Sequence, residues 1–168
     1  MATKITRNIN SEINRFIILC IEEYASITNQ HSRAIYVKLN EAGIINELKN
    51  DYEDMHGMSA YSINEYIGKR LDADVSQEPT NDNHILSKII LISQVIELIA
   101  KKYKLSIEEA RNRFYQSEVV EMLDDDETGL YGESALYLLS LYENYELKNK
   151  KMKNSDIESL YKLPPALH

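Results

Sequence analysis

The sequence repeats itself at an offset of 75 residues, and this self-similarity is the strongest restriction on the fold. At this offset Glu22 aligns with Glu97, Gly57 with Gly132 and Ser59 with Ser134. The aligned apolar pairs are Phe16 with Leu91, Ile17 with Ile92, Ile21 with Ile96, Leu39 with Phe114, Leu48 with Leu123 and Ile63 with Leu138. A repeat that keeps both apolar positions and a Gly-x-Ser break indicates that one structural unit was duplicated.

Apolar residues in each half of the chain recur at steps of three and four, the period of an amphipathic helix. The first half carries the stripe Ile13, Phe16, Ile17, Cys20, Ile21 and Tyr24, and the second carries Ile85, Ile89, Ile92, Ile96 and Ile99. With 5 Gly and 3 Pro in 168 residues, the chain has too few turn formers for a loop-rich β fold. We predict an all-α protein with two tandem copies of a roughly 60-residue four-helix module, plus a short C-terminal helix.

Composition divides the chain into four segments. We predict helical module 1 at 8–71, a linker at 72–83, helical module 2 at 84–147, and a basic tail with a short helix at 148–168. The linker is nearly devoid of apolar residues and holds the first proline of the chain, as is typical of connecting segments.

Local signals predict where individual helices begin and end. The predicted helix starts are Asn8 or Asn10, Ser32, the capping boxes Ser62 with Glu65 and Ser106 with Glu109, and Ser155 with Glu158 for the last short helix. Gly43 is expected to be left-handed at a helix C-terminus, and Gly57 is expected to close the third apolar stripe.

Charge disfavours binding to nucleic acids. The net charge is −8, and residues 76–147 carry 14 acidic side chains against 6 basic ones, which repels phosphate backbones. A helix-turn-helix at 32–56 would put Glu47, Asp51 and Glu53 on its recognition helix.

No apolar run is long enough to cross a bilayer, no stretch resembles a secretory signal, and a lone cysteine forms no internal disulfide. We expect a cytoplasmic protein.

Two segments resemble catalytic or metal-binding motifs. His56-Gly57-Met58-Ser59 suggests a His/Ser pair, but the second copy has Tyr131 in place of His56, and a helix break capped by Ser59 explains the pattern. The acidic run 124–129 resembles a calcium loop, yet Ala135 occupies the position of the bidentate glutamate. We therefore predict neither a metal nor a cofactor, and regard an enzyme as the least favoured class.

Three segments resemble a bacterial family of short helical proteins of unknown function. They are the run Phe16–Tyr24, Ala42-Gly43-Ile44, and Tyr52 to Gly57 with its Met-His-Gly. The similarity is good over 14–70 and weak over 88–145. Members are often encoded beside predicted ADP-ribosyltransferase-like proteins. The resemblance implies a protein that acts by binding another protein.

A protein-binding role is therefore the favoured expectation, as the neutralising or accessory component of a bacterial toxin–antitoxin-like gene pair. The 12 tyrosines fit this role, because tyrosine is enriched at interfaces. The candidate partner-binding residues are Tyr52, Asp54, His56, Asp124, Asp125, Asp126, Glu127 and Tyr131. An enzyme with a basic cleft would suit these carboxylates. The alternatives are a nucleic-acid-binding regulator and an acidic inhibitor from a mobile element that mimics nucleic acid.

Overall fold

The computed structural model describes residues 8–73, 75 and 84–161, with side chains described up to residue 149, and over these residues the chain is helical without a strand. The helices are α1 (Ile9–Thr28), α2 (Ser32–Glu41), α3 (Ile44–Asn50), α4 (Tyr52–Met55), α5 (Ala60–Arg70), α6 (Ile85–Tyr103), α7 (Ile107–Tyr115), α8 (Glu118–Asp124) and α9 (Ala135–Tyr161). Two short 3₁₀ turns, η1 (Asp126–Thr128) and η2 (Leu130–Gly132), join α8 to α9. The predicted all-α class is confirmed.

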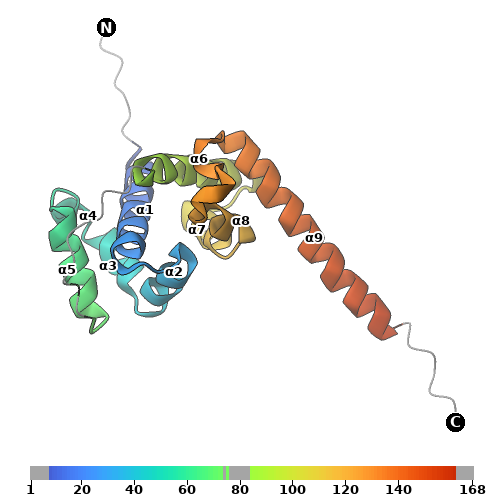
Figure 1. Cartoon of the computed structure of the whole chain (residues 1–168), viewed down its shortest axis with the longest axis horizontal. Helices are drawn as coiled ribbons and strands as arrows, with labels where there is room; N and C mark the ends of the chain where they lie inside the picture. Colours follow the sequence, from blue (N-terminus) through green and yellow to red (C-terminus); the bar gives the residue numbers. More distant parts are fainter. Residues whose placement is uncertain (1–7, 74, 76–83, 162–168) are drawn as a thin grey trace, which may run out of the picture.

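The long helices α1 and α6 pack against each other at the centre (Figure 1). In the first half (residues 8–73) α1 contacts α2, α3 and α5, and in the second half (residues 84–161) α6 contacts α7 and α9. α2 reaches across to contact α7 and α8. Buried side chains from both halves, including Ile17, Ile92 and Phe114, belong to one apolar core.

Several predicted helix ends are confirmed. Asn8 caps α1 by accepting a hydrogen bond from the Ser11 amide, and Ser106 caps α7 by accepting one from the Glu109 amide. Gly43 is left-handed, with φ of 74°, and separates α2 from α3.

Other predicted helix boundaries are wrong. The box at Ser62 and Glu65 does not start a helix, because Ser59 already caps α5 and its hydroxyl accepts from the Ser62 amide. Ser32 is the first residue of α2 rather than its cap, and its hydroxyl is used elsewhere. The third apolar stripe is divided into α3 and α4 at Asp51.

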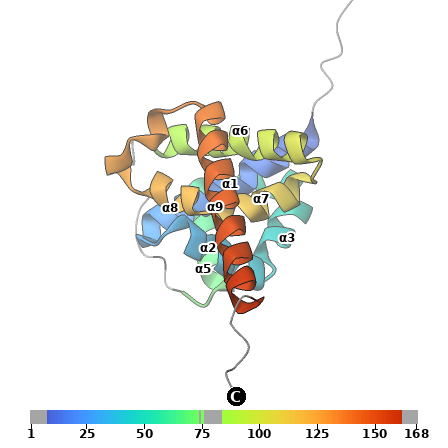
Figure 2. The same cartoon turned by 90° about the vertical axis from the view of Figure 1, so that its right-hand side faces the viewer.

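The predicted short C-terminal helix is also wrong, since 135–161 is one helix that continues through the basic segment 148–153 (Figure 2). The physical reason is that this stretch has no Gly or Pro to stop helix propagation, while lysine and leucine favour it. The stop expected at Pro164-Pro165, the first seven residues and most of the linker 72–83 lie outside the described residues. No helix in the described part of the chain has the length and apolar character required to cross a membrane.

We expect Gly43→Ala to lower the free energy of unfolding by about 1 kcal/mol, because a Cβ makes the left-handed backbone unfavourable. A Cβ on Gly43 would meet no atom within 4 Å, so backbone strain is the whole effect. Gly57 is the matched control, since its surroundings are equally open and its φ is not positive. Urea denaturation should show Gly57→Ala equal to or more stable than the wild type. Equal losses in both variants would contradict the strained turn.

Candidate functional site

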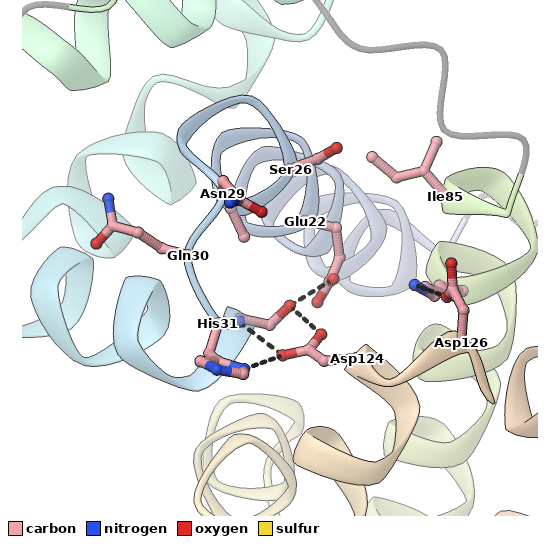
Figure 3. Close-up of a pocket in the computed structure, with 11 residues that line it drawn as sticks. Glu22, Ser26, Asn29, Gln30, His31, Ile85, Asp124 and Asp126 are labelled. Atoms are coloured by element: carbon pink, nitrogen blue, oxygen red, sulfur yellow. Dashed lines mark hydrogen bonds and ion pairs between the residues drawn. The ribbon is translucent and has the colours of Figure 1, made fainter. Parts of the chain in front are cut away.

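A polar cavity of about 410 Å³ lies where the two halves meet (Figure 3). Residues from α1, α2, α6, α8 and η1, and from the loop between α1 and α2, line it. Its polar lining includes Glu22, His31, Ser32, Lys88, Asp124 and Asp126.

Glu22 is the most deeply placed of these groups. It lies on α1 one turn after Ile18 and one turn before Ala25, on the face that packs into the core. The Tyr115 hydroxyl donates to Glu22 Oε1 at 2.9 Å, and the Ser32 hydroxyl donates to Oε2 at 2.7 Å. Each of its carboxylate oxygens therefore has a hydroxyl partner, one of them from the opposite half of the chain.

Asp124, the last residue of α8, caps α2 from the other half of the chain. Its Oδ2 accepts a hydrogen bond from the Ser32 amide at 2.9 Å, and its Oδ1 lies 2.8 Å from the Ser32 hydroxyl. The first amides of a helix have no partner within the helix and favour negative charge. The exposed His31 ring also lies beside this carboxylate, with Nδ1 at 3.7 Å from Oδ2.

A single hydroxyl proton on Ser32 lies between two carboxylates, and it can be donated to one of them at a time. The set of hydrogen bonds is complete when Glu22 is protonated, because Glu22 then donates to Ser32 and Ser32 donates to Asp124. Burial is the main cause that raises the Glu22 pKa, from 4.5 to about 7, and the charge of Asp124 raises it further. The hydrogen bonds from Ser32 and Tyr115 and the charge of Lys88 oppose this shift.

Lys88 supplies positive charge on the α6 side of the cavity. Its side chain is 9% exposed, and its Nζ lies 2.7 Å from Asp126 Oδ1. A buried ammonium group requires such an ion pair to offset its lost hydration. Two residues of the acidic run thus contact the cavity: Asp124, which is half-buried, and Asp126, whose side chain is exposed.

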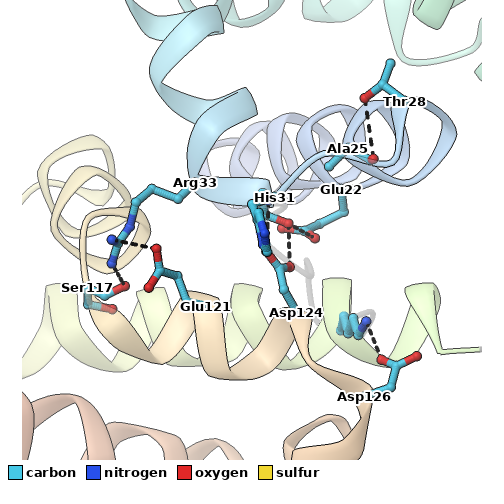
Figure 4. Close-up of polar contacts among 11 residues, drawn as sticks. Glu22, Ala25, Thr28, His31, Arg33, Ser117, Glu121, Asp124 and Asp126 are labelled. Atoms are coloured by element: carbon cyan, nitrogen blue, oxygen red, sulfur yellow. Dashed lines mark hydrogen bonds and ion pairs between the residues drawn. The ribbon is translucent and has the colours of Figure 1, made fainter.

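Arg33 makes a second polar contact between the halves (Figure 4). From α2 it donates to the Ser117 carbonyl at 2.5 Å and to Glu121 at 2.8 Å. It therefore satisfies a carbonyl beyond the end of α7 while pairing with a carboxylate of α8. Nearby, the Tyr36 hydroxyl donates to Asn112 at 2.8 Å, and the Tyr36 ring stacks on Tyr115.

The arrangement around Ser32 is suited to holding a proton. In a nucleophilic site the serine hydroxyl donates to a basic imidazole that a carboxylate orients. Here the carboxylates themselves lie on the hydroxyl, and Asp124 lies between it and His31. Within the described residues, no group of three or more His, Cys, Asp or Glu side chains has a geometry for a metal ion.

The structure places the candidate residues of the first half away from this cavity. Tyr52 is buried on α4, where it packs edge-on against Phe16 and stacks on His56 with ring centroids 4.6 Å apart. His56 Nδ1 lies 2.7 Å from the Tyr52 carbonyl oxygen, and Asp54 is exposed. Figure 1 shows α4 on the opposite side of the molecule from α8, so the two candidate groups do not form one site.

The candidate residues of the second half point in different directions. Asp124 and Asp126 contact residues of the cavity, and Asp125, Asp126 and Glu127 are all exposed. Tyr131 is half-buried and stacks on His84 with ring centroids 3.9 Å apart. The acidic run therefore provides two contacts to the cavity, through Asp124 and Asp126, and exposed charge at Asp125 and Glu127.

Sequence reasoning missed Glu22, Ser32 and Lys88 as members of a site. One available signal was a charged residue on an apolar helix face, since Glu22 interrupts the stripe of α1. A second was the identity of Glu22 and Glu97 at the 75-residue offset. No local pattern shows that Asp124 caps a helix 92 positions earlier in the chain.

Comparisons with protein-family models, with curated proteins and with solved structures found no match to this chain.

We expect Glu22→Gln to gain stability relative to the wild type as the pH rises from about 4.5 to about 7. The folded wild type holds this proton to a higher pH than the unfolded chain, so ionisation of Glu22 costs stability across that window and by a constant amount above it. Glutamine imitates the protonated acid and escapes this cost, which is on the order of 3 kcal/mol for a shift of this size. Urea denaturation of both proteins from pH 4 to pH 8 measures the difference.

Two neighbouring substitutions test the cause of the shift. Lys88→Met should raise the pKa of Glu22 because it removes a favourable charge, and Asp124→Asn should lower it because it removes an unfavourable one. Carboxyl ¹³C NMR titration of Glu22 reports both. A stability difference between wild type and Glu22→Gln that is independent of pH would refute the protonation account.

Proposed function

We propose that this chain is a non-catalytic protein-binding protein, the neutralising or accessory component of a cytoplasmic bacterial toxin–antitoxin-like gene pair. The observation that carries the proposal is that exposed carboxylates on α8 and in its connection to α9 are followed by two exposed apolar side chains in the first turn of α9. We call these residues the acidic surface and define it by Glu118, Asp125, Glu127, Glu133, Leu136 and Tyr137, all of which are exposed.

The carboxylates of this surface differ from those of the cavity in what they contact. Asp124 contacts Ser32 and Asp126 pairs with Lys88, whereas Asp125 caps η1 by accepting from the Glu127 amide, and the side chains of Asp125 and Glu127 are exposed. Clustered outward charge of one sign accelerates encounter with a partner of the opposite charge. A protein with a basic cleft is the partner that this electrostatic pattern supports.

Leu136 and Tyr137 add the apolar part that a stable contact requires. They occupy the first turn of α9 and are 66% and 47% exposed. Tyrosine is enriched among residues that dominate binding energy, and a central apolar anchor with a polar rim is the usual anatomy of an interface.

Helix α9 offers a further element that a partner can bind. It is 27 residues long, and its C-terminal part extends away from the other helices (Figure 1). Its first turns are fixed to the body by the buried side chains Leu138, Leu139 and Tyr142. An extended helix anchored at one end is a suitable ligand for a groove. The family resemblance to proteins encoded beside predicted ADP-ribosyltransferase-like proteins supports the same class of function.

We also infer that the two halves arose by duplication of one module. The recurring helix starts support this, because α2 begins at Ser32 and α7 at Ile107, and α5 begins at Ala60 and α9 at Ala135. Asn29 and Lys104 end α1 and α6 in the same left-handed conformation, with φ of 50° and 53°. Ser59 and Ser134 each accept from the amide three residues later. After the duplication the surfaces of the two halves diverged, and the second half came to carry the acidic surface.

Neutralising the acidic surface should weaken capture of the partner. The test variant carries Glu118→Gln, Asp125→Asn, Glu127→Gln and Glu133→Gln, and all four side chains are exposed. The tagged full chain is used to isolate a partner from its native host, and the purified pair is then measured by calorimetry. We expect a dissociation constant at least about tenfold weaker than for the wild type, with a slower association rate.

A matched variant in the first half carries Glu41→Gln, Asp51→Asn, Glu53→Gln and Glu65→Gln, which are also exposed. It removes the same charge and should leave the affinity within about twofold, since distant exposed charges are screened. Equal losses in both variants would show that net charge alone acts. Failure to recover any stoichiometric protein partner would argue against the proposal as a whole.

A further inference from the structure

A second cavity of about 330 Å³ lies between the beginning of α1 and the beginning of α7. Asn14, Lys49, Glu108 and Arg111 are among the residues that line it. It is separate from the Glu22 cavity, with which it shares no lining residue.

Arg111 brings a buried positive charge to this cavity. Its exposed fraction is 3%, and its Nη1 donates to Asn14 Oδ1 at 3.1 Å, which is the sole hydrogen bond the described residues make with it. A guanidinium group has five N–H donors and stays charged in proteins. Burying it with one neutral acceptor leaves both charge and donors to be satisfied.

Asn14 has an amide that is only half used. The side chain is fully buried, and its Nδ2 has no hydrogen-bond partner among the described residues. The amide orientation is fixed because Oδ1 must face the donating Arg111. Two more N–H donors beside the guanidinium are therefore available to an acceptor.

The charges of the neighbouring side chains do not balance the positive charge of Arg111. Glu108 forms an ion pair with Lys49, so these two residues offset each other. No hydrogen bond or ion pair joins Glu108 to Arg111 in the described part of the chain. Ser106 and Ile107 place the first turn of α7 at the same cavity, and a helix N-terminus favours negative charge.

We propose that this cavity binds an oxyanion, the carboxylate or phosphate group of a small ligand, through Arg111 and the amide of Asn14. The planar guanidinium presents paired donors that match two oxygens of either group. A bound oxyanion supplies the acceptors that both buried side chains lack and neutralises the excess charge. This site is independent of the protein-binding role proposed for the acidic surface.

Calorimetric titration of the full chain with inorganic phosphate, and separately with acetate, tests the proposal at constant ionic strength set by chloride. We expect saturable binding of at least one anion to the wild type, and the arm that saturates identifies the oxyanion class. Arg111→Met should weaken that binding by roughly tenfold or more, because a charge-assisted hydrogen-bonding group is lost. Arg113→Met is the matched control on the same helix, since Arg113 is exposed and pairs with Glu109, and it should bind like the wild type.

Asn14→Leu is the second variant, of similar size and without donors, and it keeps the test decisive if Arg111→Met does not fold, as judged by circular dichroism. It should also weaken binding while Arg113→Met does not. Saturable binding that is equal in wild type, Arg111→Met and Asn14→Leu would overturn the proposal and indicate an adventitious ion only. Absence of saturable binding of either anion to the wild type would overturn it as well.

Discussion

The contact of Glu22 and Asp124 with the Ser32 hydroxyl is the interaction on which the rest of this structure depends. It joins α1 and α2 of the first half to α8 of the second, and Tyr115 extends it to α7. Packing between α1 and α6 is the most extensive contact between two of the described helices, but apolar packing is non-directional. Buried polar contacts require one geometry, so in this account they fix how the halves are oriented. Arg33 with Glu121, and Asn14 with Arg111, act at the same junction.

The helical class and most helix positions could be predicted because they depend on local periodicity. Stripes at steps of three and four predicted α1 and α6, and Asn8 and Ser106 marked the caps of α1 and α7. The errors arose where local signals compete. Ser62 with Glu65 matches a capping box, whereas Ser59 is followed three residues later by Ser62, and nothing local shows that Ser59 is the cap that is used. The basic segment 148–153 resembled a helix end by charge, yet it lacks the Gly or Pro that would stop α9.

The site could be predicted only in part, because its members meet through tertiary packing. The acidic run was recognisable, but the sequence does not show that Asp124 caps α2 or that Asp126, itself exposed, pairs with Lys88. Both contacts depend on where α2 and α6 lie relative to α8. They make the run a structural connection between the halves, while the proposed function uses its exposed charge. Glu22 gave a signal as a charged residue on the apolar face of α1, but the sequence does not show that Tyr115 and Ser32 meet it there.

The polar contacts of Glu22, Ser32 and Asp124 are expected to make the two halves one cooperative unit. Native-state amide hydrogen exchange of the full chain at low, increasing urea concentrations measures it directly, because it reports the opening free energy of each helix separately. If the two halves unfold together, the slowest amides of α1 and α2 converge with those of α6 and α8 on one common opening free energy, which is the result we expect. A plateau for the first half that lies well below that of the second would contradict it, because the halves would then open independently.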